Sequence, residues 1–494
     1  MKARKRRPAG KVAGPAEASV LKFSAGGVRA PLKSSAAPDV DAAGSVETLA
    51  RRISRAVSIP TVSYADYSRI DLKQHRNFHV FLRRAFPLVH KNLEFRKIND
   101  YALLYFWKGS EQSLKPYLLA AHFDVVPAED SSHNEWAHSP FAGHIDGGFV
   151  WGRGTLDIKM SLVAIMHAAE SLLAEGYRPA RGVYFAFGGD EEIDGKKGAR
   201  SIASFLAEQG VELEYVLDEG TVIASGMYPG IEEPMALVSI AEKGHCNVSL
   251  NVSAGGGHSS LPHKENAVGI LCKAVTRLDS RPFPARLTDP VRLFLKGISR
   301  HSSFPERVVL SRPGLFWPIL KIILSRNSNT NAMIRTSAAV TMISGSDKEN
   351  VLPAAAQANI NVRILPGESI RSVLDRIEKV IDDSRVAVRP NPDWLPNEPV
   401  DCSDPLSYGY SAISQAIKRI VPEALILPFL LSGSTDSKHY TTLTPYIYRF
   451  SPVILNQDEL KGIHGVNERI SMDNIRRCAD FYITIISITS EKAL

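Results

Sequence analysis

The chain has 494 residues, of which 44% are hydrophobic and 22% are charged, as in an ordinary soluble protein with room for two or three domains. Residues 1–33 hold nine basic residues and one acid, so this stretch carries a formal charge of +8 and the rest of the chain −1. The near-neutral remainder argues against nucleic-acid binding by the folded part. The chain has no apolar run of about 18 residues, so we expect no transmembrane helix.

The first 45 residues are rich in Ala, Pro, Gly and Ser and predict a disordered basic tail. The apolar segment of a secretory signal does not follow the charges, while a basic transit peptide stays an alternative. Four cysteines are scattered without a CxxC pair, which is typical of reduced thiols; they are Cys246, Cys272, Cys402 and Cys478. These features together favour a cytoplasmic protein.

The first part of the chain alternates buried strands with helices. Helices are predicted over residues 46–57, 71–89, about 160–175 and 196–209, and strands over 93–97, 102–107, 117–124, 182–187 and 215–217. Polar residues follow several of these strands, at the carboxyl ends where open α/β sheets place their sites. The pattern predicts an α/β domain with a site at the carboxyl edge of its sheet.

The pattern of apolar and polar residues changes near residue 241. Residues 244–252 alternate as a half-buried strand does, and two strand–helix–strand units follow, with a Pro-rich aromatic insertion at about 282–334. We therefore predict a small domain of ferredoxin-like pattern over 241–395, inserted into a larger domain made of 46–240 and 396–494. For Phe316, Trp317 and Ile322 of the insertion we favour core packing over an acyl site or a dimer face.

The strand 117–124 ends in two polar residues, His122 and Asp124. Residues i and i+2 of a strand point to the same face, so both side chains emerge together from an apolar strand. One interpretation is a buried, hydrogen-bonded His–Asp pair. The other is a metal-binding imidazole that a carboxylate orients.

Further acids and imidazoles lie at element ends or in polar loops. The set that could bind metal is His122, Asp157, Glu192, Asp218 and His464. Two histidines with several carboxylates suit zinc, cobalt or manganese. Converging carboxylates would repel one another without metal, and two divalent cations bridged by Asp157 would remove that repulsion. Glu191 precedes Glu192; the pair is either a solvated acidic turn or a ligand next to a proton acceptor.

Nine motifs in order make the chain resemble the M20 family of dinuclear zinc amidohydrolases, and most of all its carboxypeptidase S branch, which includes N-fatty-acyl amino acid hydrolase/synthases. The motifs are LLAAHFDVVP (118–127), WGRGTLDIKM (151–160), FGGDEEIDG (187–195), VLDEG (216–220), GGGHSSLPH (255–263), NVLP (350–353), NVRILPG (361–367), GSTDSKHY (433–440) and HGVNERI (464–470). They span nearly all of the chain except the tail. The resemblance implies that the larger domain is a zinc-peptidase-like α/β catalytic domain with a mixed sheet between helices, and that the inserted domain is a ferredoxin-like lid or dimerisation domain.

The resemblance implies a role for each candidate residue. One metal would be held by His122, Asp157 and Asp218, and the other by Asp157, Glu192 and His464. Asp124 would orient His122, and Glu191 would be the general base and then the general acid. His258 would stabilise the oxyanion, often reaching across a homodimer.

The same resemblance implies that Arg363 and Asn350 grip the free carboxylate of the substrate, with Ser434 and Thr435 in the substrate loop. The chain departs from the family pattern at two positions of this loop. Ser434 stands where a Gly is usual, and Lys438 stands where an Arg is commoner. We expect both differences to bear on the choice of substrate more than on catalysis. Taken singly, His258 could be a mobile loop histidine, Arg363 an ion-pairing strand residue and His464 a helix C-cap.

We therefore predict a metal-dependent hydrolase that cleaves the amide next to an amino acid with a free carboxylate, as a carboxypeptidase acting on short peptides. The alternative substrate is an N-acyl amino acid, with fatty-acyl groups included, that an amidohydrolase/synthase cleaves or makes. A third hypothesis, a non-catalytic metal- or peptide-binding module, is opposed by Glu191, which metal binding alone does not require. The expected partners are a small-molecule substrate and, as an option, a second copy of the chain.

Overall fold

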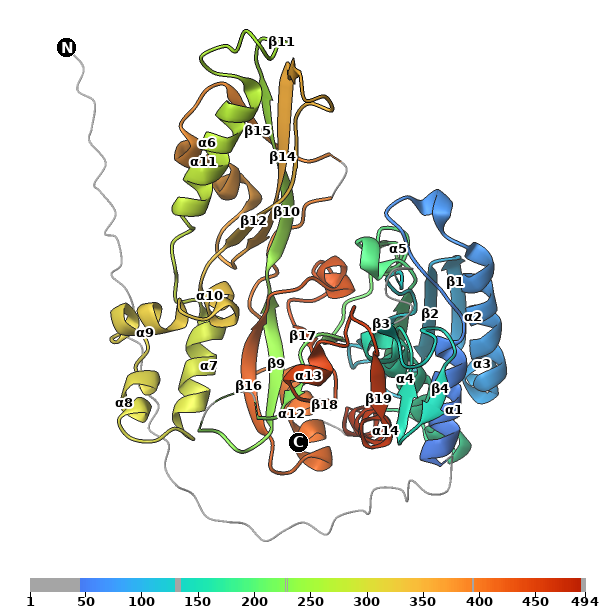
Figure 1. The fold of residues 1–494 in the computed structure, drawn as a ribbon. Helices are drawn as coiled ribbons and strands as arrows, with labels where there is room; N and C mark the ends of the chain where they lie inside the picture. The colour runs from blue at the N-terminus through green and yellow to red at the C-terminus, as the bar shows by residue number, and fades with distance from the viewer. Residues whose placement is uncertain (1–44, 129–134, 227, 229, 393–394, 490–494) are drawn as a thin grey trace, which may run out of the picture. The chain divides into compact units, whose positions relative to one another are not determined.

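The computed structural model describes residues 45–128, 135–226, 228, 230–392 and 395–489. The predicted tail lies outside these residues except for Ser45. Two separate sheets dominate the fold (Figure 1), a large mixed one and a smaller antiparallel one. The predicted α/β class is therefore confirmed. The domain boundaries at residues 240/241 and 395/396 stay a prediction.

The large sheet has ten strands in the order β1-β2-β6-β3-β7-β17-β9-β8-β18, with β16 paired to β9. Their bounds are β1 Glu94–Asn99, β2 Ala102–Trp107, β3 Tyr117–His122, β6 Val183–Gly188, β7 Val216–Asp218, β8 Ile223–Ala224, β9 Met235–Glu242, β16 Leu425–Leu431, β17 Ile447–Arg449 and β18 Ile454–Leu455. Strands β6, β3, β7 and β17 are parallel neighbours. Their carboxyl ends therefore meet at one edge of the sheet.

Helices cover both faces of this sheet. They are α1 Val46–Val57, α2 Leu72–Ala85, α3 Pro87–Asn92, α4 Met160–Ala174, α5 Ala199–Glu208, α12 Tyr408–Ile420, α13 Gln457–Leu460 and α14 Met472–Ile488. Strand β3 shows why both faces are apolar: Leu119 packs into the core with α4 and α14, while Leu118 packs against α5. A strand buried on both faces must be apolar along its whole length.

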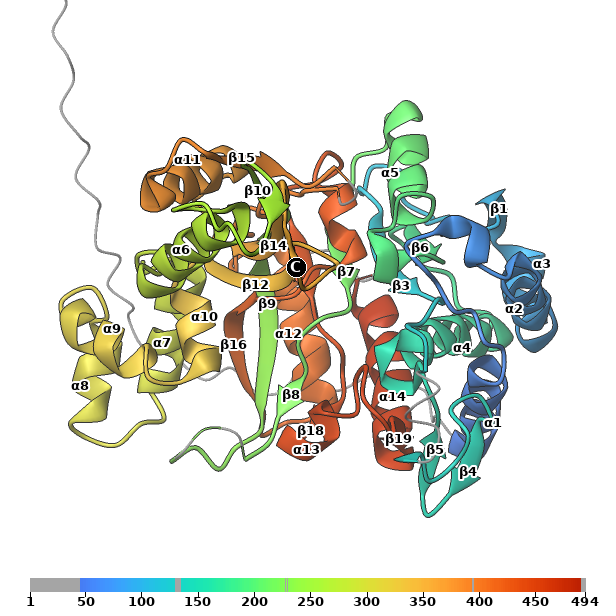
Figure 2. The same ribbon diagram turned by 45° about the horizontal axis from the view of Figure 1, so that its top comes forward.

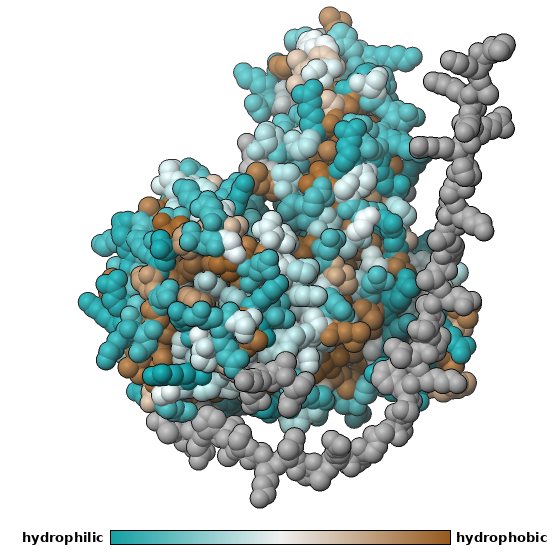
Figure 3. All heavy atoms as spheres, turned by 180° about the vertical axis from the view of Figure 1, so that it is seen from behind, coloured by the Kyte–Doolittle hydropathy of each residue, from teal (hydrophilic) through white to brown (hydrophobic). Residues whose placement is uncertain are grey.

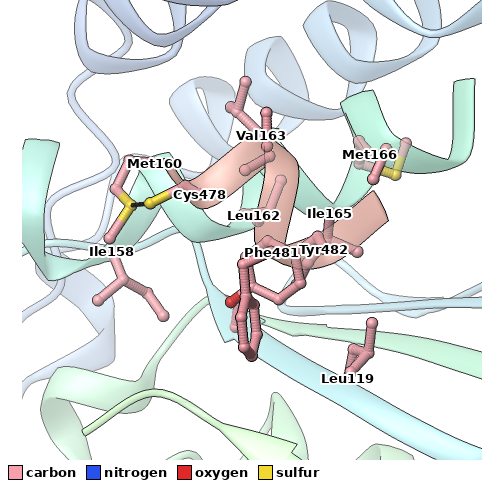
Figure 4. Packing of buried hydrophobic residues seen from close by; sticks show 14 of the residues in the cluster. Leu119, Ile158, Met160, Leu162, Val163, Ile165, Met166, Cys478, Phe481 and Tyr482 are labelled. Atoms are coloured by element: carbon pink, nitrogen blue, oxygen red, sulfur yellow. Dashed lines mark hydrogen bonds between the residues drawn. The ribbon is translucent and has the colours of Figure 1, made fainter. Parts of the chain in front are cut away.

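The core under α4 is drawn in Figure 4. Helix α4 is buried nearly all round, and Leu162 and Ile165 lie close to Phe481 and Tyr482 of α14. A sulfur contact of 3.1 Å joins Cys478 Sγ to Met160 Sδ. This packing fixes the start of α4, which directly follows the turn that carries Asp157.

The small sheet is antiparallel throughout, in the order β12-β14-β10-β15, with α6 and α11 packed on one face. Figure 2 shows these two helices beside the sheet. The elements are β10 Gly244–Ser253, α6 Ala267–Ser280, β12 Ser337–Ser344, β14 Ala355–Ile364, α11 Ile370–Ile381 and β15 Val386–Pro390. A short pair, β11 Gly257–His258 with β13 Val351–Leu352, lies at its far tip (Figure 1).

The Pro-rich insertion is helical, which the sequence did not predict. It forms α7 Asp289–Ser299, α8 Glu306–Ser311, α9 Trp317–Leu324 and α10 Ser328–Ile334. Residues of α7, α9 and α10 share a core with β9 and β16 of the large sheet. Phe316 and Trp317 pack partly buried against this core, whereas Ile322 is exposed. Core packing, the favoured interpretation, is thus confirmed for the two aromatic residues and is wrong for Ile322.

The helix predicted over 71–89 is two helices in the structure. It divides at Phe86, because Pro87 lacks the N–H that would continue the hydrogen-bond ladder and disfavours helical backbone at the residue before it. A third small sheet, β19-β5-β4, joins Arg469–Ser471, Phe149–Trp151 and His144–Asp146. None of the described helices is long and apolar enough to cross a membrane.

Candidate active site

The carboxyl ends of β3, β6 and β7 bring the first group of candidate residues together. His122 ends β3, Glu191 and Glu192 follow β6, and Glu219 follows β7. His122 Nε2 lies 3.0 Å from Asp157 Oδ1 and 3.0 Å from Glu219 Oε1. These three residues form a set whose ligand atoms all lie within 4.8 Å of one another.

A second set shares Asp157. His464 Nε2 lies 3.0 Å from Asp157 Oδ2 and 3.2 Å from Glu192 Oε2, and the three ligand atoms again lie within 4.8 Å of one another. The two oxygens of Asp157 therefore face different sets. This is the arrangement of a carboxylate that bridges two cations.

Asp124 is fully buried next to His122. Its Oδ1 lies 3.4 Å from His122 Nδ1, on the side of the ring that faces away from Asp157. The same carboxylate accepts hydrogen bonds from the backbone N–H groups of Glu191 and Glu192, at 3.0 and 3.2 Å, and from Ser63 Oγ at 2.7 Å. One side chain thus fixes both the imidazole and the Glu191–Glu192 turn.

Glu468 shapes the loop that presents Asp157. Its carboxylate accepts the backbone N–H groups of Gly154 and Leu156, at 3.0 and 2.8 Å, and pairs with Arg153 Nη1 at 2.7 Å. Arg153 also donates to the His464 carbonyl at 3.1 Å. The loops that carry Asp157 and His464 are therefore held together by one buried ion pair. In the first of these loops, Gly154 has a φ of +86°, a backbone conformation that favours glycine, and a side chain at this position would collide with Val125.

The electrostatics of the site favour cations. Burial, aided by Asp157, raises the pKa of Glu192 to about 7 and that of Glu219 to about 8. Burial also raises the pKa of Glu191 well above its usual range. The Oε1 atom of Glu192 is buried and has no hydrogen-bond partner among the described residues. Crowded carboxylates with an unpartnered oxygen fit divalent metal ions, which would relieve their mutual repulsion.

The pKa values of the two histidines are also raised, here by the neighbouring carboxylates and against the effect of burial. Burial alone would lower the pKa of His122, but Glu219, Asp124 and Asp157 outweigh burial and raise it well above its usual range. Hydrogen bonds to Asp157 and Glu192 raise the pKa of His464 to about 10. The carboxylates that face both rings stabilise a positive charge, which a metal ion between the ring nitrogens and these carboxylates would supply in place of the proton.

Asp218, which the sequence suggested as a ligand, is not part of either set. Its Oδ1 accepts the backbone N–H of Glu219 at 2.8 Å, and its buried Oδ2 has no hydrogen-bond partner among the described residues. The neighbouring Glu219 reaches His122 instead. The sequence analysis did not single out Glu219, although it lies in the VLDEG motif, and it gave no role to Arg153 or Glu468; the assignment of Asp218 as a ligand stays a prediction.

A cleft of about 710 Å³ opens onto these residues. Its lining joins the carboxyl edge of the large sheet, with Asp157 and Glu191, to the small sheet, with Arg363. Ser434 and Thr435 also line it, and Thr435 is held by Glu242, which accepts from its Oγ1 at 3.0 Å. Arg363, Ser434 and Thr435 therefore face the same space as the candidate metal sets.

Two predicted residues do not reach this cleft. His258 is exposed on β11, with its Nδ1 2.8 Å from Ser260 Oγ. The Asn350 carbonyl accepts the N–H of Ser259 at 3.1 Å, so both residues belong to the far tip of the small sheet. Within a single chain they lie apart from the cleft lining.

Comparison with known proteins identifies the chain at the level of the family. The model of peptidase family M20/M25/M40 matches residues 118–487. A probable carboxypeptidase S-like protein of Dictyostelium discoideum is 38% identical over 447 residues, which cover 90% of this chain and 85% of the relative. The N-fatty-acyl-amino acid synthase/hydrolase PM20D1 of Mus musculus is 38% identical, with 87% of this chain and 86% of the relative covered.

Solved structures agree on the fold. An M20 family metallo-carboxypeptidase from Sulfolobus solfataricus superimposes with a TM-score of 0.65 at 16% identity, covering 90% of this chain and 99% of that one. The sequence matches extend over nearly the whole described chain and include both candidate metal sets. The chain therefore belongs to the M20 family and is a metal-dependent hydrolase of this dinuclear metallopeptidase and amidohydrolase family.

Proposed function

We propose that the protein hydrolyses the amide bond next to an amino acid with a free carboxylate, as a carboxypeptidase acting on short peptides. The observation that carries this proposal is one cleft that holds both an acid–base group, Glu191, and a cation, Arg363. A substrate whose carboxylate lies at Arg363 would extend its amide toward Glu191 and the two metal-binding sets. Arg363 is a suitable partner because its guanidinium matches the geometry of a carboxylate.

The residues present fit two divalent cations. We assign one cation to His122, Asp157 and Glu219 and the other to Asp157, Glu192 and His464, with Asp157 as the bridge. Imidazole with carboxylate oxygen favours zinc, with cobalt and manganese as alternatives. Glu219 takes the place that the sequence suggested for Asp218, which becomes a residue that positions the Glu219 backbone.

When bound, the two cations would supply Lewis acidity that polarises the substrate carbonyl and lowers the pKa of the attacking water. The carboxylate of Glu191 accepts the proton of that water, and its Oε2 lies 3.9 Å from His122 Nε2, beside the first set. The protonated Glu191 then delivers the proton to the nitrogen of the leaving amine. Asp124 keeps the His122 ring and the Glu191 backbone in place throughout.

Stabilisation of the oxyanion is assigned to His258 of a second copy of the chain. Within one chain His258 is exposed at the tip of the small sheet and does not line the cleft. A homodimer that brings this tip to the cleft of its partner would complete the site. Asn350 lies at the same tip and would enter with it, so its contact with the substrate carboxylate depends on the same dimer.

The second candidate substrate is an N-acyl amino acid. The cleft lining includes three apolar residues, Met342, Leu431 and Ile463, and such residues suit an aliphatic acyl chain. The similarity to N-fatty-acyl-amino acid synthase/hydrolases supports the same substrate class. The hypothesis of a non-catalytic binding module is not retained, because the chain belongs to a family of enzymes.

The test is amino acid release from a panel of dipeptides and N-acyl amino acids. The enzyme would be stripped of metal and then supplied with zinc, cobalt or manganese. Release that returns only with metal supports the proposal, and the preferred members of the panel choose between the peptide and the acyl substrate. No release from any member, with metal bound to the protein, contradicts it.

A further inference from the structure

The outer face of helix α9 is apolar and uncovered. Ile319, Ile322 and Ile323 are 53%, 60% and 52% exposed. They lie at spacings of three and four residues, so they share one side of the helix. Leu315, in the turn just before the helix, is also 70% exposed. We call the three isoleucines the α9 patch.

The opposite side of α9 is already used for packing. Leu320 is buried, and Trp317 and Leu324 pack partly buried against the core that α7 and α10 share with the large sheet. The position of the helix is therefore fixed by its inner face, and the outer isoleucines contribute nothing to that core. A helix that is apolar on both sides normally has both sides covered, which indicates an interaction surface.

Basic residues flank the patch along the chain. Residues 300–327 contain the exposed cations Arg300, Arg307, Arg312, Lys321 and Arg326 against one acid, Glu306, for a formal charge of +4. Among the described residues, none of these five cations forms an ion pair with a carboxylate. In Figure 3, which views the molecule from behind, a few brown spheres show at the right-hand edge, the side on which α8 and α9 lie.

We propose that the α9 patch docks the enzyme on an anionic lipid surface, with the isoleucines in the interface and the cations at the lipid headgroups. Apolar residues flanked by Lys and Arg are the features of helices that lie in a membrane interface. Anionic headgroups complement the net positive charge of the segment. The attachment is peripheral and needs no membrane-spanning helix.

The charge distribution disfavours two other occupants of the patch. A symmetric dimer through α9 would place the same patch of two copies face to face, and thus bring like charges together. The first 33 residues carry +8, so the tail of the chain would also meet like charge there. An anionic surface is the occupant that complements both the apolar stripe and its basic surroundings.

The experiment is co-sedimentation of the full-length, zinc-supplied protein with phosphatidylcholine vesicles that contain or lack phosphatidylserine. The double variant Ile319→Asp/Ile322→Asp removes the apolar stripe and leaves the basic tail intact. The matched control is Leu406→Asp, at a residue that is 89% exposed outside the insertion. Hydrolysis of a soluble short substrate would confirm that the variants are folded, since neither site lines the cleft.

We expect wild type and the Leu406 variant to bind phosphatidylserine vesicles equally. The double variant should bind at least about tenfold more weakly, because partitioning follows buried apolar area. Arg312→Gln/Arg326→Gln should weaken binding by about tenfold on anionic vesicles only, because each cation contributes to the attraction of the anionic surface.

Three results would overturn the proposal. In the first, wild type does not bind the vesicles. In the second, the double variant binds as strongly as wild type, which would assign the binding to the basic tail. Alternatively, light scattering without lipid could show a wild-type dimer that the double variant converts to a monomer, which would make the patch an interface between copies.

Discussion

Replacing Glu219 with Gln should remove one of the two metal ions, whereas replacing Asp218 with Asn should only weaken one. Glu219 Oε1 lies 3.0 Å from His122 Nε2 and belongs to the first ligand set. Asp218 belongs to neither ligand set, and its Oδ1 accepts the Glu219 N–H at 2.8 Å. Loss of such an outer partner typically lowers metal affinity by about 10–100-fold. Loss of a ligand should exceed that range, which corresponds to more than about 2.7 kcal/mol of binding free energy.

The assay is metal content after equilibrium dialysis against buffered zinc, with circular dichroism to verify folding. Wild type should retain two ions, one for each ligand set. Glu219→Gln should retain one at zinc concentrations that saturate wild type, and Asp218→Asn should recover the second ion when zinc is raised. The reasoning is refuted if Asp218→Asn permanently loses an ion while Glu219→Gln keeps both.

Three further predictions concern the surroundings of the site. Glu242→Gln should lower the free energy of unfolding, measured with urea, by about 3 kcal/mol, because it leaves the fully buried Arg449 without the carboxylate that lies 2.7 Å from its Nε; an unchanged midpoint would contradict this. Arg363→Gln should raise KM by about 10–100-fold with a smaller effect on kcat, because a hydrogen bond to a charged group contributes about 1.5–3 kcal/mol; an unchanged KM would remove Arg363 from substrate binding. Burial, with Arg52 nearby, lowers the pKa of His167 to about 4. The unfolded chain therefore binds the extra proton between pH 6.5 and 4, so the free energy of unfolding should fall by about 3 kcal/mol as pH drops through this window. His167→Gln should flatten that part of the urea-measured pH profile, and an identical slope in the variant would count against the assignment.

The central strands could be predicted because their sequence carries a strong signal. Strands β3 and β6 are buried on both faces, so they appear as continuous apolar runs that end in polar residues. The same runs place His122 and the Glu191–Glu192 turn at one edge of the sheet. The first half of the site therefore follows from local pattern and the rule for parallel strands.

The insertion could not be predicted from the same signals. Its helices are short, and Pro290 and Pro318 suggest loops in a one-dimensional pattern. In the structure each proline lies in the first turn of a helix, where its missing N–H has no intrahelical partner to lose. The helices are instead fixed by the apolar residues that they bury against β9 and β16, which are distant in sequence.

The choice between Asp218 and Glu219 shows a different limit. Adjacent residues at a strand end point to opposite faces, so one acid of the pair can reach the site. The motif identifies the pair but not the face, because that depends on how β7 lies beside β3 in the sheet. The roles of His258 and Asn350 depend on a second copy of the chain, and a single sequence does not encode where that copy would lie.

The most direct test of the account is the turnover of Glu191→Gln with metal bound. The substitution keeps the shape of the side chain and removes its capacity to accept a proton, while both ligand sets remain intact. The account predicts wild-type metal content and a loss of turnover of about 10²–10⁴-fold on the preferred substrate. Turnover near that of wild type, at full metal content, would contradict the assignment of Glu191 as the general base.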